Sequence, residues 1–324
     1  MSRKLNENDI RAIVTGSALL GAGGGGSLEA AYKMLEEGKK RAGELSLELI
    51  ENSELAPGGS ACVVTGYYLP DAVAGREAEL LEAGVNALVS IRQSAYISGK
   101  RVEAAMPMDR GALSSLLPAL ACACEGLPLV DADGCGRGAA DLFDTMFEEG
   151  DIAFSPAVIC DGKGNVVRVY PYNAADCKAA ANMAYYFRAA FENLSALGAW
   201  LCGAADIEGK LSCGSLSLAE KIGRAMLDGN DCPCKAAGRL EEEFGFRTIA
   251  EGSVVEKCDD AISFKSDDGA VYTVKYDRAY RSIAKDGKPV ADDAKLFCAI
   301  DCATGLPVPS DDVKIGQKLR WLAV

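Results

Sequence analysis

The sequence predicts an α/β protein, with a three-layer α/β/α N-terminal domain around a largely parallel sheet and a C-terminal β-rich, barrel-like domain. Two observations lead to this prediction. Up to about residue 150, short apolar runs alternate with helical patterns, which is typical of parallel sheets covered by helices. From Thr248 onward, alternating strands pair around glycine-containing turns, as in small barrels and sandwiches. We expect the two domains at residues 1–165 and 166–324.

The N-terminal domain opens with two helices. Asn8 or Asp9 can cap the first, whose apolar residues recur at helical spacing from Ile10 to Leu20. Ser27 can cap the second, over 27–40. Strands are then expected at 46–50, 61–68, 102–106 and 128–133. Helices are expected within 75–100 and at 113–126 and 138–150. A hairpin at 153–171 and two helices at 174–194 and 215–227 lead into the β-rich region.

Four consecutive glycines separate the first two helices: Gly23, Gly24, Gly25 and Gly26. Together with Gly21 they satisfy G-x-G-x-x-G, but a dinucleotide site requires a strand before the glycines, and here a helix precedes them. We therefore expect no nucleotide cofactor. Two interpretations stay open. The glycines let a ligand approach the backbone near a helix N-terminus, or they form a tight corner between helices packed on the sheet.

Composition excludes several classes of function. The 324-residue chain carries a net charge of −13, which argues against a nucleic-acid partner. It contains no histidine, so Ser-His, Cys-His and His-ligated metal chemistry are excluded. The thirteen cysteines, in a chain without a signal peptide, predict reduced thiols and a cytoplasmic location. The longest apolar runs are too short for a transmembrane helix, so no membrane association is expected.

Two loops that follow predicted strands concentrate reactive side chains, at 106–115 and 131–142. Neighbouring parallel strands end at the same edge of a sheet, so these loops should converge. The candidates are Asp109, Arg110, Asp131, Asp133, Gly134, Cys135 and Arg137. Clustered carboxylates bind a hard cation or divide acid and base roles. Each aspartate also has a structural alternative, such as capping a helix. The environment of Cys135, between glycines and near an arginine and a helix start, would lower a thiol pKa.

The ordered motifs GSALLGAGGGGS, VEAAMPMDRGALSSLLP, GLPLVDADGCGRG, SCGSLSLAEKIGRA and LFCAIDCATGLPV resemble the S-methyl thiohydantoin desulfurase-like family, from about Asn8 to the C-terminus. That family is often encoded beside hydantoinase or oxoprolinase subunits. The resemblance implies an α/β N-terminal domain, a barrel-like C-terminal domain, and hydrolysis of five-membered cyclic ureides or their thio analogues. The Asp131–Gly134 loop matches the family motif directly. The first loop departs from it, with Asp109, Arg110 and Ser114 where relatives commonly have Glu, an apolar residue and Asn.

The leading hypothesis is a hydrolase acting on a hydantoin-like or thiohydantoin-like ring, with water activated by a carboxylate or by a bound Zn²⁺ or Mn²⁺. Asp133 is the expected base or metal ligand, with Asp131 as a further metal ligand and Asp109 as the second carboxylate. Cys135 is the candidate nucleophile. Arg110 or Arg137 would hold an acidic substituent or stabilise developing negative charge. The glycine run and Gly134 would contact substrate through their backbone.

The alternative is a non-catalytic accessory subunit of a hydantoinase/oxoprolinase-type enzyme, which the altered first loop motivates. As partners we expect a small cyclic ureide, a hydantoinase or oxoprolinase subunit, and a second copy of the chain in a homo-oligomer.

Overall fold

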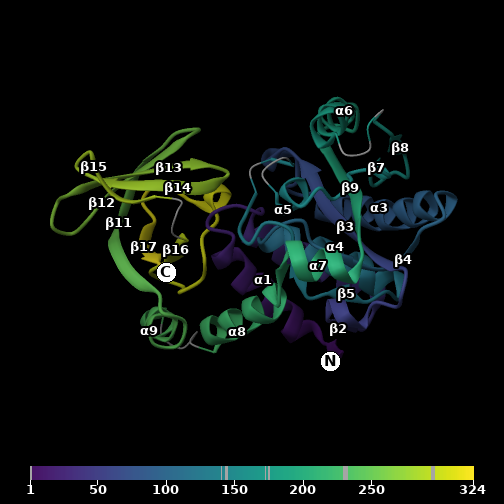
Figure 1. Ribbon diagram of the computed structural model, residues 1–324. Coiled ribbons are helices and arrows are strands. Elements are labelled where there is room, and N and C mark those ends of the chain that lie inside the picture. Colours follow the sequence, from purple (N-terminus) through teal and green to yellow (C-terminus); the bar gives the residue numbers. More distant parts are fainter. Residues whose placement is uncertain are drawn as a thin grey trace.

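A mixed sheet of eight strands forms the centre of the N-terminal half (Figure 1). The computed structural model describes residues 2–139, 141–142, 145–171, 173, 176–228, 233–292 and 296–324. The strand order is β1-β2-β5-β4-β3-β9-β7-β8. The strands are β1 (Arg3–Leu5), β2 (Leu47–Ile50), β5 (Leu129–Val130), β4 (Arg101–Met106), β3 (Gly59–Tyr68), β9 (Leu194–Cys202), β7 (Ala157–Cys160) and β8 (Val166–Val169). Only the β2-β5-β4-β3 block is parallel, so the prediction of a largely parallel sheet is corrected to a mixed one.

Both faces of this sheet are buried. On β3, Cys62 and Val64 belong to one apolar cluster and Ala61 and Val63 to the other, following the two-residue period of a strand. The first face carries α1 (Glu7–Leu20), α2 (Leu28–Ala42), α3 (Glu77–Ile97) and α4 (Ala112–Glu125). The second carries α5 (Met146–Glu149), α6 (Cys177–Ala190) and α7 (Ala204–Lys210). The N-cap of α1 is Asn6 rather than Asn8 or Asp9, and Asp9 closes a capping box from the N3 position.

The segment expected as one strand at 128–133 divides at Asp131. Leu129–Val130 stays in the central sheet, whereas β6 (Ala132–Asp133) pairs antiparallel with β10 (Ser212–Cys213) in a separate two-stranded sheet. The helix expected at 138–150 is reduced to α5, and residues 140, 143 and 144 lie outside the described part of the chain. The Ala139 N–H donates to the Asp109 carboxylate, which ties the start of this segment to the first loop.

Strand β9 is absent from the sequence prediction, which expected a helix to residue 194 and nothing regular before 215. All nine residues of β9 are buried, and it lies between β3 and β7. A strand buried on both faces lacks the polar–apolar alternation that marks a half-exposed strand, so periodicity does not reveal it. The expected domain boundary at 165/166 falls inside the β7–β8 hairpin, whose two strands pair directly.

The C-terminal half is a curled antiparallel sheet of seven strands, a half-barrel with open edges at β15 and β16 (Figure 1). Helices α8 (Ser215–Leu227) and α9 (Pro233–Phe244) lead into it. The strands are β11 (Arg247–Lys257), β12 (Ala261–Lys265), β13 (Val271–Asp277), β14 (Ala279–Lys285), β15 (Lys288–Asp292), β16 (Phe297–Asp301) and β17 (Lys318–Ala323). Its core is built around the buried aromatic side chains of Phe264, Tyr280, Phe297 and Trp321.

Within the described residues, no helix combines the length and the apolar character required to cross a bilayer.

Candidate functional site

A small cavity lies where the glycine run, the ends of β3 and β4, and the half-barrel meet. Its volume is about 60 Å³. Residues from both halves of the molecule line it: Gly23, Gly24, Gly25, Gly26, Thr65, Gly66, Tyr68, Pro70, Met108, Asp109, Ser114, Ala139, Arg278, Ser310 and Asp311. The two loops expected to converge do contact each other, through Arg110 with Asp133 and Asp109 with Ala139. Of the described residues of the second loop, however, only Ala139 lines the cavity, and the end of β3 and the half-barrel supply the other walls.

The glycine run is a point of close backbone approach. A Cβ atom on Gly25 would stand 2.3 Å from the Cα of Gly111, and one on Gly23 would stand 2.7 Å from the ring of Tyr280. Both glycines also have positive φ, at +77° and +90°. The chain therefore needs glycine at these positions for backbone conformation and for space alike. Both interpretations of the run hold in part, since it is a tight packing corner and also lines the cavity.

The N–H groups of Gly25 and Gly26 donate to no acceptor among the described residues, whereas the Gly25 carbonyl accepts from Leu113 and Ser114 at the start of α4. The N-terminus of α2 is not open to an external anion. Its Leu28 N–H donates to the Asp312 carboxylate at 2.8 Å. The half-barrel thus supplies the anion that this helix end attracts, and the glycine N–H groups are the donors left for a ligand.

Asp109 is the buried acid of the cavity, with 2% of its surface exposed. Its Oδ2 accepts from the Ala139 N–H at 2.8 Å, and its Oδ1 has no partner of standard geometry among the described residues. Burial raises the pKa of Asp109 from 3.8 to about 7; Ser114, the Ala139 N–H and the Arg278 charge oppose the rise, and the Asp133 charge adds to it. Such a carboxyl both takes and gives a proton near neutral pH.

Several lining residues were not predicted from the sequence, and Tyr68 and Arg278 are the two that bear most on its chemistry. Tyr68 ends β3, the parallel neighbour of β4, so the strand-end rule that selected Asp109 could also have selected it. Arg278 lies in the turn between β13 and β14, more than 160 positions along the chain from Asp109. Nothing in its local sequence marks it, because only the docking of the half-barrel brings it to the cavity.

A second cavity of about 180 Å³ adjoins the first and shares Gly66, Met108, Ala139 and Arg278 with it. Its remaining wall includes Arg188, which is 7% exposed. The guanidinium of Arg188 lies over the rings of Tyr67 and Tyr185, with its carbon 5.2 and 4.8 Å from the two ring centroids. Its Nε has no acceptor among the described residues. A buried, incompletely paired guanidinium favours an anionic ligand group.

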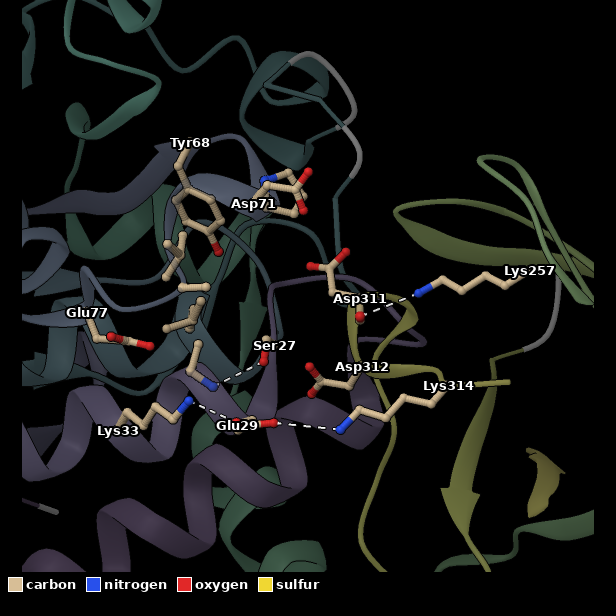
Figure 2. Close-up of a pocket in the computed structure, with 15 residues that line it drawn as sticks. Ser27, Glu29, Lys33, Tyr68, Asp71, Glu77, Lys257, Asp311, Asp312 and Lys314 are labelled. Atoms are coloured by element: carbon tan, nitrogen blue, oxygen red, sulfur yellow. Dashed lines mark hydrogen bonds and ion pairs between the residues drawn. The ribbon is translucent and has the colours of Figure 1, made fainter. Parts of the chain in front are cut away.

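An outer cavity of about 360 Å³ opens on the other side of Tyr68. Figure 2 shows its charged lining, with Glu29 and Lys33 on α2 and with Asp311, Asp312 and Lys314 arriving from the half-barrel. Its three lysines have protein partners. Lys33 and Lys314 pair with Glu29, and Lys257 donates to main-chain carbonyls of Ser310 and Val313. The outer cavity shares Tyr68, Pro70 and Asp311 with the first cavity.

Asp133, the expected base, is paired with donors of the protein. It is fully buried and accepts hydrogen bonds from Arg110 Nε at 2.9 Å and from the N–H groups of Cys135 and Gly136. Arg110 also donates to Ser212 at 2.7 Å. Neither Asp133 nor Arg110 lines the cavity. This buried pair fixes the second loop to the first and to β10, which is the structural alternative that the sequence left open.

The metal site expected from Asp131 and Asp133 does not fit the donor geometry. Asp131 Oδ1 accepts from the N–H groups of Leu216 and Ser217, and Oδ2 accepts from the Ser217 hydroxyl, so Asp131 caps α8. Asp133 is saturated by Arg110 and backbone donors. The described residues contain no group of three or more Cys, Asp or Glu side chains arranged to hold a metal ion.

The remaining candidates also serve the architecture. The Cys135 thiol donates to the Met108 carbonyl at 3.2 Å and packs against the second apolar cluster, away from the cavity lining. Arg137 donates to the Tyr280 carbonyl at 2.9 Å and thereby ties the second loop to the half-barrel. A Cβ on Gly134 would stand 2.1 Å from the Phe147 ring, so this glycine provides packing space rather than substrate access.

Comparison with known proteins shows the fold and the family of the chain. A crystal structure of a protein from Chromobacterium violaceum, solved in a structural-genomics programme, superposes with a TM-score of 0.87 at 21% identity. The match covers 99% of this chain and 91% of that one, and at this identity it establishes the fold alone. No protein with a curated description matches the chain. The family model described as S-Me-THD-like, N-terminal domain, matches residues 8–170, which is half of the chain. The chain therefore belongs to the S-Me-THD-like family.

Proposed function

We propose that this protein is a hydrolase that adds water to the sulfur- or oxygen-bearing carbon of a hydantoin-like or S-methyl-thiohydantoin-like ring. Asp109 is the general base and acid. The observation that carries the proposal is the placement of this carboxyl, buried, incompletely hydrogen-bonded and with a pKa of about 7, in a cavity lined by glycine backbone. Family membership supplies the substrate class.

For an S-methyl-thiohydantoin ring the steps balance as follows. The Asp109 carboxylate takes a proton from water while the water oxygen bonds to the ring carbon, and the electron pair of the C=N bond moves to nitrogen. The hydroxyl proton then passes to that nitrogen, the C=O bond forms and the C–S bond breaks. The departing methanethiolate takes the proton from Asp109. One water is consumed, one methanethiol is released, and Asp109 is regenerated.

The surroundings of Asp109 suit these steps. The N–H groups of Gly25 and Gly26 are available to donate to the substrate. The second cavity would receive the substituent of the ring, and its buried Arg188 favours an acidic one. This role replaces the one expected of Arg110 and Arg137, both of which are engaged in structural contacts. No step is routed through a metal ion, since the expected ligands do not fit one.

The first test is turnover on a panel of hydantoins, thiohydantoins and S-methyl thiohydantoins, with wild type, Asp109→Asn and a surface control, Asp260→Asn. We expect at least a 100-fold loss of kcat in Asp109→Asn, because its amide cannot accept the proton of water. We also expect the wild-type rate to rise as the pH passes about 7, where Asp109 becomes a carboxylate. Wild-type turnover that Asp109→Asn retains in full would refute the assignment.

A folded wild type that is silent across the panel would instead favour the accessory-subunit hypothesis. Two tyrosines are exposed at the surface. Tyr170, after β8, is 52% exposed, and Tyr186, on α6, is 75% exposed. Exposed aromatic side chains would suit a protein partner. Co-purification with a hydantoinase-type subunit, lost on replacing both tyrosines by serine, would support that alternative.

A further inference from the structure

Arg278 is held at the cavity by its backbone. It lies in the β13–β14 turn with φ +56°, and its carbonyl accepts from the buried Ser310 hydroxyl at 2.5 Å. Ser310 in turn bonds the Gly23 carbonyl through its N–H at 2.9 Å, and its hydroxyl lies 3.0 Å from the same oxygen. One buried serine therefore joins the backbone of Arg278 to the glycine run across the two halves of the molecule.

The side chain of Arg278, by contrast, has no hydrogen-bond or ion-pair partner in the part of the chain that the structure describes. It lines both inner cavities. The other arginines of the region differ in this respect, since Arg110 pairs with Asp133 and Arg137 donates to a carbonyl. An arginine fixed at its backbone and open at its guanidinium is arranged to meet a ligand.

The charge of Arg278 acts on the acids of the cleft. Burial raises the pKa values of Asp109, Tyr67 and Tyr68, and the Arg278 charge opposes the rise in each case. All three lie in cavities that Arg278 shares or adjoins. A cation therefore lines the cavity in which the proposed reaction develops negative charge.

We propose that Arg278 is a second catalytic residue, whose guanidinium contacts the substrate and stabilises the negative charge that forms on the ring when water adds. This inference rests on the hydrolase function proposed above and extends it. As Asp109 takes the proton of water and becomes neutral, the ring becomes an anion, and a cation fixed beside it lowers the energy of that state. The active site would then be completed by the half-barrel, outside residues 8–170.

The test compares Arg278→Gln, Arg278→Lys and Arg278→Ala with Arg281→Gln, an arginine three positions along β14. Lys, Gln and Ala lack β-branching and accept the positive φ no worse than arginine does. For Arg278→Gln we expect a drop in kcat of about 100-fold, with the acid limb of the pH–rate profile moved to higher pH because Arg278 no longer lowers the pKa of Asp109. Arg278→Lys should recover part of the rate, and added guanidinium should rescue Arg278→Ala but not Asp109→Asn.

The outcomes separate the two proposals. An active wild type whose Arg278→Gln and Arg278→Ala variants stay within about twofold in kcat, with an unmoved pH profile, would overturn the role of Arg278 and leave the hydrolase standing. A wild type that turns over no member of the panel would overturn the hydrolase proposal and this extension with it. A melting temperature of Arg278→Lys close to that of the wild type would show that a low rate does not come from loss of folding.

Discussion

At the scale of single residues, the site is defined by which acid remains incompletely paired. Asp131, Asp133 and Asp109 come from the same two loops and look alike in the sequence. Asp131 is hydrogen-bonded by the N-terminus of α8, and Asp133 by the Arg110 guanidinium and backbone donors. Asp109 keeps one carboxylate oxygen without a standard partner in the described structure. Ionising Asp109 in the folded protein therefore costs free energy, and this cost raises its pKa. A carboxyl with a raised pKa can act as base and acid near neutral pH.

This cost gives a stability prediction for Asp109→Asn. The folded pKa of about 7 lies above the ordinary value of 3.8, so the folded state holds its proton more tightly and stability is lost as the pH rises through that window. The shift corresponds to an order of 4 kcal/mol at full ionisation. We expect Asp109→Asn to melt at a higher temperature than wild type at pH 8 and to show little difference at pH 4. Equal melting shifts at the two pH values would contradict the raised pKa.

At the scale of elements, the two halves are joined by a crossing of α1 and α8 that depends on glycine. A Cβ on Gly16 would stand 1.8 Å from the Ala219 carbonyl oxygen, and one on Gly223 would stand 1.8 Å from that of Ala12. Reciprocal glycines let the two helix backbones touch, and α1 leads directly into the glycine run. The position of the glycine run, which lines the first cavity, therefore depends on this crossing.

Gly223→Ala should destabilise the protein by more than 2 kcal/mol in urea unfolding, because the added methyl forces the helices apart. The matched control is Gly209→Ala in α7, where a Cβ meets nothing within 4 Å. There the alanine should be neutral or stabilising by about 0.5–1 kcal/mol. Similar destabilisation of both variants would indicate that helix crowding is not the cause.

At the scale of the whole molecule, the half-barrel closes the cleft. Ser310 bonds the glycine run, Asp312 caps α2, Arg137 reaches the Tyr280 carbonyl, and the Tyr280 N–H donates to the Ala22 carbonyl at 2.6 Å. These contacts all lie beside the cavity. Docking of the half-barrel and assembly of the site are therefore one event.

Ser310→Ala tests this coupling. The variant loses the buried hydroxyl that lies between the Gly23 and Arg278 carbonyls, which should cost about 1–3 kcal/mol in unfolding free energy. We expect faster amide hydrogen exchange in the glycine run and a lower kcat, with Ser266→Ala on the surface as control. Unchanged exchange at Gly23–Gly26 would show that Ser310 does not hold the two halves together there.

The sequence by itself determined the family, the α/β and β-rich halves, the helix before the glycine run and the loop that carries Asp109. These follow from local signals, namely periodicity, turn glycines and motif order. Tertiary structure alone decided that β9 lies between β3 and β7, that Asp133 and Asp131 are paired with donors of the protein, and that Tyr68, Arg188 and Arg278 line the cavities. The physical reason is that burial and the pairing of charges depend on contacts between segments far apart in the chain, and no local pattern records which carboxylate will find a partner.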